Sequence, residues 1–187
     1  MKKLGVLAAV CLLVVFTSKA QSVGVGIKGG LNMSTLSELD DSSTKTGFHF
    51  GGYLRLKLGG IGLQPEIYYS GQGSKIDAGT VKETIDMKYV NIPVLLRFNP
   101  VPIINLHIGP QFGLLTSASD EDGDIKDQLK SSDIAAVVGA GLDLPFGLNF
   151  TVRYVKGLSK INEFGSGSNK GNMFQVSVGY DLVKIGK

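Results

Sequence analysis

The chain has 187 residues, of which 19% are charged, and a formal net charge of +3. This length allows one domain, and the charged fraction excludes a highly charged disordered chain. Its 26 glycines, about twice the usual share, favour a glycine-rich β protein over an ordinary helical enzyme. One cysteine cannot close an intramolecular disulfide, and together with two histidines it cannot supply the usual ligand set of a zinc site.

The first twenty residues predict a secretory signal peptide. A basic start at residues 1–3 precedes an unbroken apolar run of 13 residues, 4–16, and small residues follow as far as Ala20. As a helix this run reaches about 20 Å, short of the roughly 30 Å hydrocarbon core that a spanning helix must cross. We therefore predict cleavage between Ala20 and Gln21.

Cleavage at this point divides the chain into the signal peptide, residues 1–20, and the mature domain, residues 21–187. An uncleaved anchor is the alternative. Lipid attachment at Cys11 is disfavoured because Val10 stands where a lipoprotein signal normally carries Gly or Ala. The mature chain of 167 residues has 16 basic and 16 acidic side chains and no net charge. Overall charge therefore gives no argument for binding nucleic acid or anionic membrane surfaces.

The mature chain alternates apolar residues with polar or small ones, which is the period of a β-strand with one apolar face. The clearest case runs from Met173 to Leu182, with the apolar residues at the even positions. The same pattern predicts eight strands, at residues 23–34, 48–58, 63–72, 85–98, 104–115, 133–144, 148–158 and 172–183.

Long and short connections alternate strictly between these strands, with lengths of 13, 4, 12, 5, 17, 3 and 13 residues. The short ones carry turn residues, such as Pro145-Phe146-Gly147, whereas the long ones are polar. An even number of antiparallel strands, with short turns at one end and long loops at the other, is typical of outer-membrane barrels. We therefore predict an all-β fold, an eight-stranded antiparallel up-and-down transmembrane β-barrel in a bacterial outer membrane.

Alternation alone does not say which face points into the barrel, because a soluble lipocalin-like barrel has the same pattern with its apolar face inside. The positions of the glycines indicate which face is inside. The lumen of an eight-stranded barrel is just wide enough for side chains to fill, so the inner face should carry the smaller residues. The apolar face carries large side chains, and the face rich in glycine is therefore predicted to be the inner one. The inner glycines are then Gly24, Gly26, Gly30, Gly51, Gly109, Gly113, Gly139, Gly141, Gly157 and Gly179.

Nine of the 14 aromatic residues of the mature chain lie on the apolar face near strand ends, which predicts two interfacial girdles. The girdle towards the long loops comprises Phe48, Phe50, Tyr69, Phe112, Tyr154 and Phe174. The girdle towards the short turns comprises Phe98, Phe150 and Tyr180.

The inner face collects charges of both signs, and unpaired charges would be costly in so narrow a lumen. We predict a salt-bridge plug, with a narrow conductance as the alternative. Arg55 and Glu66 flank the turn near Gly59 and should be opposite or diagonal neighbours. The predicted inner set comprises Lys28, His49, Arg55, Lys57, Glu66, Arg97, His107, Asp143, Arg153 and Asp181.

Three segments carry a resemblance to a known family: GIKGGLN at 26–32, PEIYYS at 65–70, and YVNIPVLL at 89–96. In these segments the chain resembles the PorT-like family of small outer-membrane β-barrel proteins of the Bacteroidetes, and Gln21 after the cleavage site is similar to that group's signals. The resemblance implies the same fold and location. Few members have an assigned activity, and one is tied to a secretion system, so it implies little about function.

Pro65, Pro93 and Pro110 lie inside predicted strands. Each removes a backbone hydrogen-bond donor from a strand that is paired on both sides, because a closed barrel has no edge strand. We therefore expect local β-bulges at these positions.

The longest loop contains an acidic run, Asp120 to Asp124. A calcium hand would need glycine at its sixth place and glutamate at its twelfth, but counting from Asp120 gives Ile125 and Ser131. We predict a solvated acidic loop, with a loose divalent-cation site as the alternative.

A lipid-modifying enzyme in the barrel wall would need a nucleophile, a base and an orienting acid within hydrogen-bond reach. His49 and His107 are the only imidazole bases, and both are predicted to point inward. We interpret both as lumen residues with satisfied hydrogen bonds, and we predict no enzymatic activity, cofactor or metal.

The predicted function is that of an integral outer-membrane protein with a structural or interaction role. Its expected partners are outer-membrane lipids and, through the long loops, extracellular or envelope proteins, but not nucleic acid. A soluble lipocalin-like carrier and a lipid-modifying outer-membrane enzyme are the alternatives. The four long loops are centred on residues 35–47, 73–84, 116–132 and 159–171.

Overall fold

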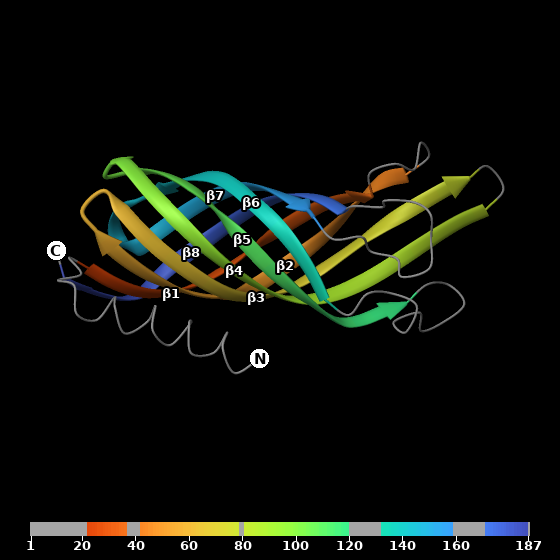
Figure 1. Ribbon diagram of the computed structural model, residues 1–187, viewed down its shortest axis with the longest axis horizontal. Helices are drawn as coiled ribbons and strands as arrows, with labels where there is room; N and C mark the ends of the chain where they lie inside the picture. The colour runs from red at the N-terminus through yellow and green to blue at the C-terminus, as the bar shows by residue number, and fades with distance from the viewer. Residues whose placement is uncertain (1–21, 37–41, 79–80, 120–131, 159–170, 187) are drawn as a thin grey trace.

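The structure, a computed structural model, describes residues 22–36, 42–78, 81–119, 132–158 and 171–186. Within these residues eight antiparallel strands close into a barrel in sequence order, which confirms the predicted up-and-down β-barrel (Figure 1). No helix in the described part of the chain is long and apolar enough to cross a membrane. The strands are β1 (Ser22–Leu36), β2 (Ser42–Leu58), β3 (Ile61–Ala78), β4 (Val81–Val101), β5 (Ile104–Ser119), β6 (Ser132–Asp143), β7 (Leu148–Gly157) and β8 (Gly171–Gly186).

Every predicted strand is present, but several are longer than predicted on the side of the long connections. β3 and β4 form one hairpin across the predicted loop 73–84, and their backbone pairing continues out to Ala78 and Val81. The predicted loop 35–47 contains the start of β2, and 116–132 contains the end of β5. These loop boundaries were too wide, because a neighbouring strand satisfies the backbone of a polar segment as well as that of an apolar one.

The short connections lie at one end of the barrel, together with both ends of the described chain (Figure 1). We call this the turn end and the opposite end the loop end. Between β2 and β3 the chain reverses at Gly59, whose φ of 63° is left-handed and favours glycine. Between β6 and β7 a short 3₁₀ helix, η2 (Pro145–Gly147), makes the reversal.

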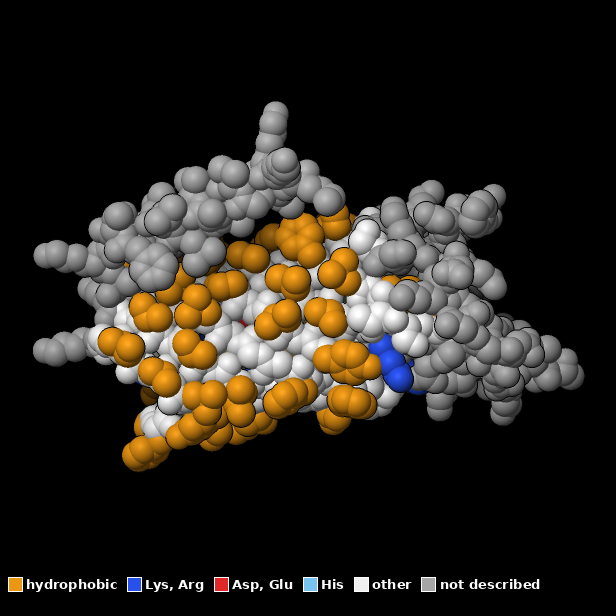
Figure 2. Space-filling model, turned by 90° about the horizontal axis from the view of Figure 1, so that it is seen from below, with side chains coloured by type: hydrophobic (Ala, Val, Ile, Leu, Met, Phe, Trp, Pro, Cys, Tyr) orange, Lys and Arg blue, Asp and Glu red, His pale blue; other side chains and the backbone are white. Residues whose placement is uncertain are grey.

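Large apolar side chains cover the outer surface of the barrel (Figure 2). All nine aromatic residues of the two predicted girdles are exposed there, with exposed fractions from 39% for Tyr69 to 61% for Phe50. Soluble monomers rarely expose so much contiguous apolar surface, whereas the wall of a barrel in lipid does. The prediction that the apolar face points outward is confirmed.

The strand prolines interrupt the pairing without changing its register. Pro65 lies in a gap in the β2–β3 ladder and Pro110 in a gap in the β4–β5 ladder that begins after Pro93, and the register is the same on both sides of each gap. The predicted bulges at these prolines are therefore wrong. A proline omits one donor, and the pairs on either side hold the alignment. Register shifts occur instead after Val25, Thr44, Lys88 and Phe98.

Candidate functional site

The inside of the barrel is the part of the described structure where polar and charged side chains gather. The ten charged and imidazole residues predicted for the inner face lie on the inward-facing positions of their strands, and the prediction is confirmed. Six of them are buried: Lys28, His49, Glu66, Arg97, His107 and Arg153. The other four lie towards the turn end and are partly accessible: Arg55, Lys57, Asp143 and Asp181.

Inner glycines make room for these large side chains. A Cβ added at Gly139 would lie 2.8 Å from Cγ of Arg153 and 2.5 Å from Nε2 of His107, closer than real Cβ contacts. Gly179 has the same relation to Asn149 on β7, at 2.5 Å from its Oδ1. At these two positions the residue is glycine because a bulky polar side chain from the neighbouring strand occupies the volume that another side chain would need.

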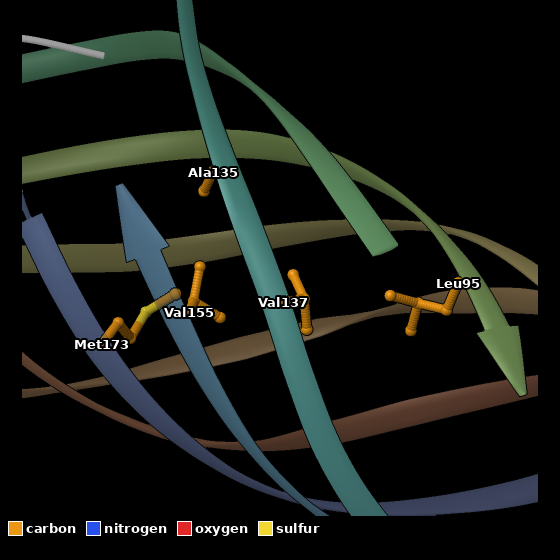
Figure 3. Close-up of a cluster of buried hydrophobic side chains, with 5 residues drawn as sticks. All are labelled: Leu95, Ala135, Val137, Val155 and Met173. Atoms are coloured by element: carbon orange, nitrogen blue, oxygen red, sulfur yellow. The ribbon is translucent and has the colours of Figure 1, made fainter. Parts of the chain in front are cut away.

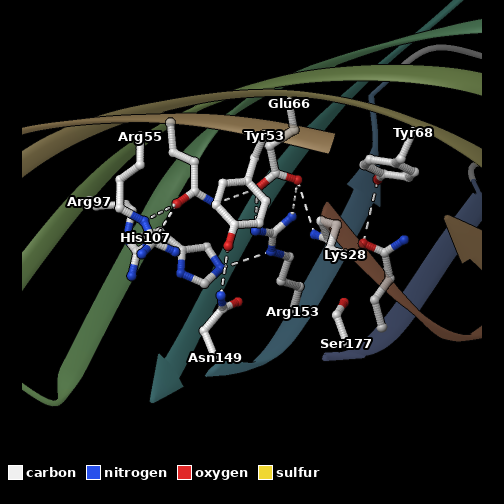
Figure 4. A network of polar contacts seen from close by, with 12 residues as sticks. Lys28, Tyr53, Arg55, Glu66, Tyr68, Arg97, His107, Asn149, Arg153 and Ser177 are labelled. Carbon is white, nitrogen blue, oxygen red and sulfur yellow. Dashed lines mark hydrogen bonds and ion pairs between the residues drawn. The ribbon is translucent and has the colours of Figure 1, made fainter. Parts of the chain in front are cut away.

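Glu66 on β3 is the centre of the buried network (Figure 4). Its carboxylate accepts two hydrogen bonds from the guanidinium of Arg153 on β7, at 2.6 and 2.7 Å, and one from Nζ of Lys28 on β1, at 3.0 Å. Nε2 of Gln64 adds a fourth, at 2.7 Å. Glu66 is completely buried, and both cations are nearly so. This paired cluster ties together three strands across the inside of the barrel.

Arg153 also donates from Nε to Nε2 of His107, at 3.0 Å. Because Arg153 is only a donor, His107 must accept at Nε2, and its Nδ1 then donates to Oδ1 of Asn105, at 3.1 Å. His49 has the same tautomer: its Nδ1 faces Oδ1 of Asn32 at 2.7 Å, and its Nε2 accepts from Ser177 at 2.8 Å. Both histidines have both ring nitrogens occupied, as expected for satisfied lumen residues.

Arg55 and Glu66 are diagonal neighbours on β2 and β3, as predicted, since Tyr53 is the direct partner of Glu66. They do not pair with each other, however. Arg55 binds Asp181 on β8, at 2.9 Å, and Glu66 takes Arg153 from β7. Barrel closure brings distant strands together across the narrow lumen, and these cross-lumen contacts replace the local pair.

The turn end holds a second ionic cluster. Arg97 on β4 makes two hydrogen bonds to the carboxylate of Asp143 on β6, at 2.7 and 2.9 Å. Gln64 connects this cluster to the centre, because its Oε1 accepts from Arg97 and Arg55 while its Nε2 binds Glu66. The two clusters therefore form one continuous network along the lumen.

Towards the loop end the interior also contains two apolar clusters, which the sequence analysis did not predict, beside buried polar residues such as Asn32 and Gln175. One cluster contains Met87, Tyr89, Leu115 and Ala118 from β4 and β5. A second cluster is drawn in Figure 3 and comes mainly from β6, β7 and β8. Inward parity would have placed these residues, since each is an apolar exception on the polar face of its strand, except for Ala118, which the register shift between Lys88 and Tyr89 brings to the inside. The second cluster comprises Leu95, Ala135, Val137, Val155 and Met173.

Some predicted features lie outside the described residues. These are the cleavage site at Ala20 and Gln21, the acidic run 120–124, and residues 159–170 of the last predicted loop. Within the described ranges, no group of three or more His, Cys, Asp and Glu side chains is placed to hold a metal ion.

The sequence matches the family described as outer membrane protein beta-barrel domain over residues 19–163. No curated protein matches the chain. Among solved structures, the fold is similar to that of Neisserial surface protein A, with a TM-score of 0.59, 11% identity, and coverage of 86% of this chain and 99% of that one. It is also similar to Ail, the attachment invasion locus protein of Yersinia pestis, with a TM-score of 0.53, 15% identity, and coverage of 88% and 99%.

These two likenesses concern the fold, and they agree with a closed barrel that is apolar outside and polar inside. The family match covers more than half of the sequence and includes seven of the eight strands. By this match the chain belongs to the outer membrane protein β-barrel domain family.

Proposed function

We propose that this integral outer-membrane barrel acts through its loop end, as a binding or structural protein of the cell surface, and not as a pore. The observation that carries the proposal is the filled lumen, with the Glu66 network at its centre and apolar clusters towards the loops. A soluble lipocalin-like carrier is not favoured, because it would need its large apolar side chains inside, and here they cover the outside.

The buried ion pairs make an open path through the lumen energetically expensive. Arg153 on β7 and Glu66 on β3 are joined by two short hydrogen bonds, and both side chains are buried from solvent. Separating them would leave buried charges without a partner, which costs several kcal/mol. The lumen is therefore suited to holding the barrel rigid.

The loop end offers a defined surface for binding. The β3–β4 hairpin is paired out to Ala78 and Val81, and β2 and β5 pair with it on both sides, through residues such as Ser43 and Ser117. In outer-membrane barrels this end faces the outside of the cell. Ail, which shares the fold, was solved in complex with a heparin analogue, and this supports an interaction role without identifying a ligand here.

We also propose that the protein is a PorT-like barrel of the Bacteroidetes, on the strength of the three sequence segments given above. It is exported by a signal peptide that is cleaved between Ala20 and Gln21. The support is the basic start, the short apolar run and the small residues that precede the site. Intact-mass measurement of protein from purified outer membranes tests this, and a chain that still carried residues 1–20 would contradict it.

The protein is proposed not to be an enzyme. Its two histidines are engaged inside the lumen, with Asn105 and Arg153 or with Asn32 and Ser177. Neither is held by a carboxylate in the arrangement that a nucleophile and its base require. Lipid mass spectrometry of cells with and without the gene tests this, and a lipid modification that depends on the gene would contradict it.

Two experiments test the main proposal. In planar bilayers, the purified protein should give no stable open-channel currents, and large stable currents would overturn the proposal of a filled lumen.

The second experiment tests the orientation in the membrane. The mature chain has no cysteine, so each single-cysteine variant can be labelled at one known position. A membrane-impermeant maleimide should label Ala78→Cys in intact cells but not Gly60→Cys in a turn. Labelling of the turn variant alone would place the loop end in the periplasm and contradict the proposal.

A further inference from the structure

The turn end of the barrel contains a hollow of about 500 Å³ that none of the functions above uses. It lies at the mouth of the barrel, beside the Arg97–Asp143 pair and between the β4–β5 turn and η2. It is lined by charged side chains of β2 and β8 on one side and by apolar residues of the two turns on the other. A water molecule occupies about 30 Å³ in the liquid, so the hollow is many times larger than one bound water and has room for several side chains.

Three cations line the hollow, two from β2 and one from β8, the strands on either side of β1. The strand register places Gly24 of β1 directly between Arg55 of β2 and Lys184 of β8. Gly24 adds no side chain, and a Cβ built there would meet no atom closer than 3.7 Å, so the space between the two cations is open. Lys57 lies one inward position further towards the turn end, opposite Ser22.

The two carboxylates of the hollow are already engaged. Asp181 accepts from Arg55 at 2.9 Å and from the hydroxyl of Tyr53 at 2.5 Å. Asp143 accepts two hydrogen bonds from Arg97. Each acid is therefore matched by an arginine. Neither lysine of the hollow, Lys57 or Lys184, has an ion-pair partner among the described residues, so the hollow carries an excess of positive charge.

The opposite wall of the hollow is apolar and includes an unusual residue. Phe146 in η2 is 95% exposed and has a φ of 66°. A β-carbon disfavours this left-handed conformation, which glycine, asparagine and aspartate adopt more readily. Ile103 in the β4–β5 turn is also half exposed, and Leu148 completes this wall. An aromatic ring is thus presented to solvent in a turn where small polar residues are usual.

We propose that this hollow is a binding site for a peptide segment of a periplasmic protein that ends in, or carries, a carboxylate. Lys57 and Lys184 bind the carboxylate in the field of Arg55, and Ile103, Phe146 and Leu148 contact an adjacent apolar side chain. Lipids meet the barrel on its outer wall, whereas Arg55, Lys57 and Lys184 lie at inward-facing positions of their strands. The size of the hollow fits a short peptide segment better than a simple ion.

The test uses protein purified from outer membranes and placed in nanodiscs. The probe is a fluorescently labelled tripeptide, Gly-Leu-Phe, with either a free or an amidated carboxyl terminus, and the readout is fluorescence anisotropy. The free acid should bind at least about tenfold more tightly than the amide, the effect of one charge-assisted contact. The double variant Lys57→Gln/Lys184→Gln should lose this preference, and Phe146→Ala should weaken both peptides equally.

The matched control is Lys156→Gln, which removes an exposed lysine at the far end of β7 and should retain the preference. Heat-modifiable gel migration confirms that each variant is a folded barrel. Equal binding of acid and amide overturns the proposal, and so does a preference that survives in the double variant. Inorganic phosphate serves as the competitor. If it displaces the acid peptide completely at equal concentration, the site takes simple anions and the peptide assignment is wrong.

Discussion

The two halves of the lumen are filled in different ways. From the centre to the turn end the interior is ionic, with Glu66, Asp143 and Asp181 each bound to arginines. Towards the loop end it combines uncharged polar residues such as Asn32 and Gln175 with apolar clusters that include Met87 and Met173. In the turn-side half, ion pairs with a specific geometry fix how the strands face each other across the lumen. In the loop-side half, close packing of side chains excludes water. Both together seal a barrel whose outer wall contributes no packed core.

Removing the central anion should have the largest effect on this arrangement. Glu66→Gln leaves Lys28 and Arg153 buried without a counter-ion, and we expect it to lower the free energy of unfolding by about 3–5 kcal/mol. Urea unfolding in detergent micelles, followed by far-ultraviolet circular dichroism, measures this. Adding Lys28→Met and Arg153→Met should recover much of the loss. A loss below about 1 kcal/mol in the single variant would show that the ionic half does not stabilise the barrel.

The apolar half is tested by Met173→Ala. Met173 is buried inside the barrel, and truncation leaves a cavity that should lower the free energy of unfolding by about 2–3 kcal/mol. The matched control is Met33→Ala on the outer wall, where lipid or detergent fills the space and the effect should be clearly smaller. Equal effects of the two changes would mean that the loop-side interior is not packed.

The inner glycines are tested by Gly139→Ala. The new methyl group meets Arg153 and His107, and overpacking of this kind should cost about 1–3 kcal/mol. Gly71→Ala on the outer face is the control, because its Cβ would meet nothing closer than 3.8 Å, and its effect should stay within about 0.5 kcal/mol. If both changes were tolerated alike, the space inside would not be the reason for glycine.

The smallest effect is expected at the open edge of the ionic half. Asp143 is 21% exposed in its side chain, so Asp143→Asn should cost only about 1–2 kcal/mol. Added salt should reduce this difference, because partly exposed pairs are screened, while the Glu66→Gln difference should change little. Unfolding curves at low and high ionic strength separate the two, and a salt-insensitive Asp143 would mean that the turn-side cluster is as buried as the centre.

Much of this architecture follows from local pattern. Alternation places the strands, and the contrast between large apolar residues and glycines says which face is outside. These inferences succeed because side-chain direction in a strand has a period of two, whatever its neighbours are. The inward set from Lys28 to Asp181 follows from the same rule.

What the pattern misses depends on neighbours across the barrel. The hairpin beyond Gly73 is polar, and it forms strands because β3 and β4 pair with each other there and β2 pairs with β3 as far as Ile76. The prolines do not bulge because flanking pairs hold the register.

The pattern along the chain was therefore enough to predict the number of strands and their inner and outer faces. Which inner residues meet depends on how the strands close in three dimensions. Glu66 lies eleven positions from Arg55 in the chain, yet it binds Arg153, 87 positions away, because closure of the barrel brings β3 and β7 face to face across a narrow lumen. The hollow at the turn end likewise exists only because β1 closes against β8 and places Gly24 between two cations.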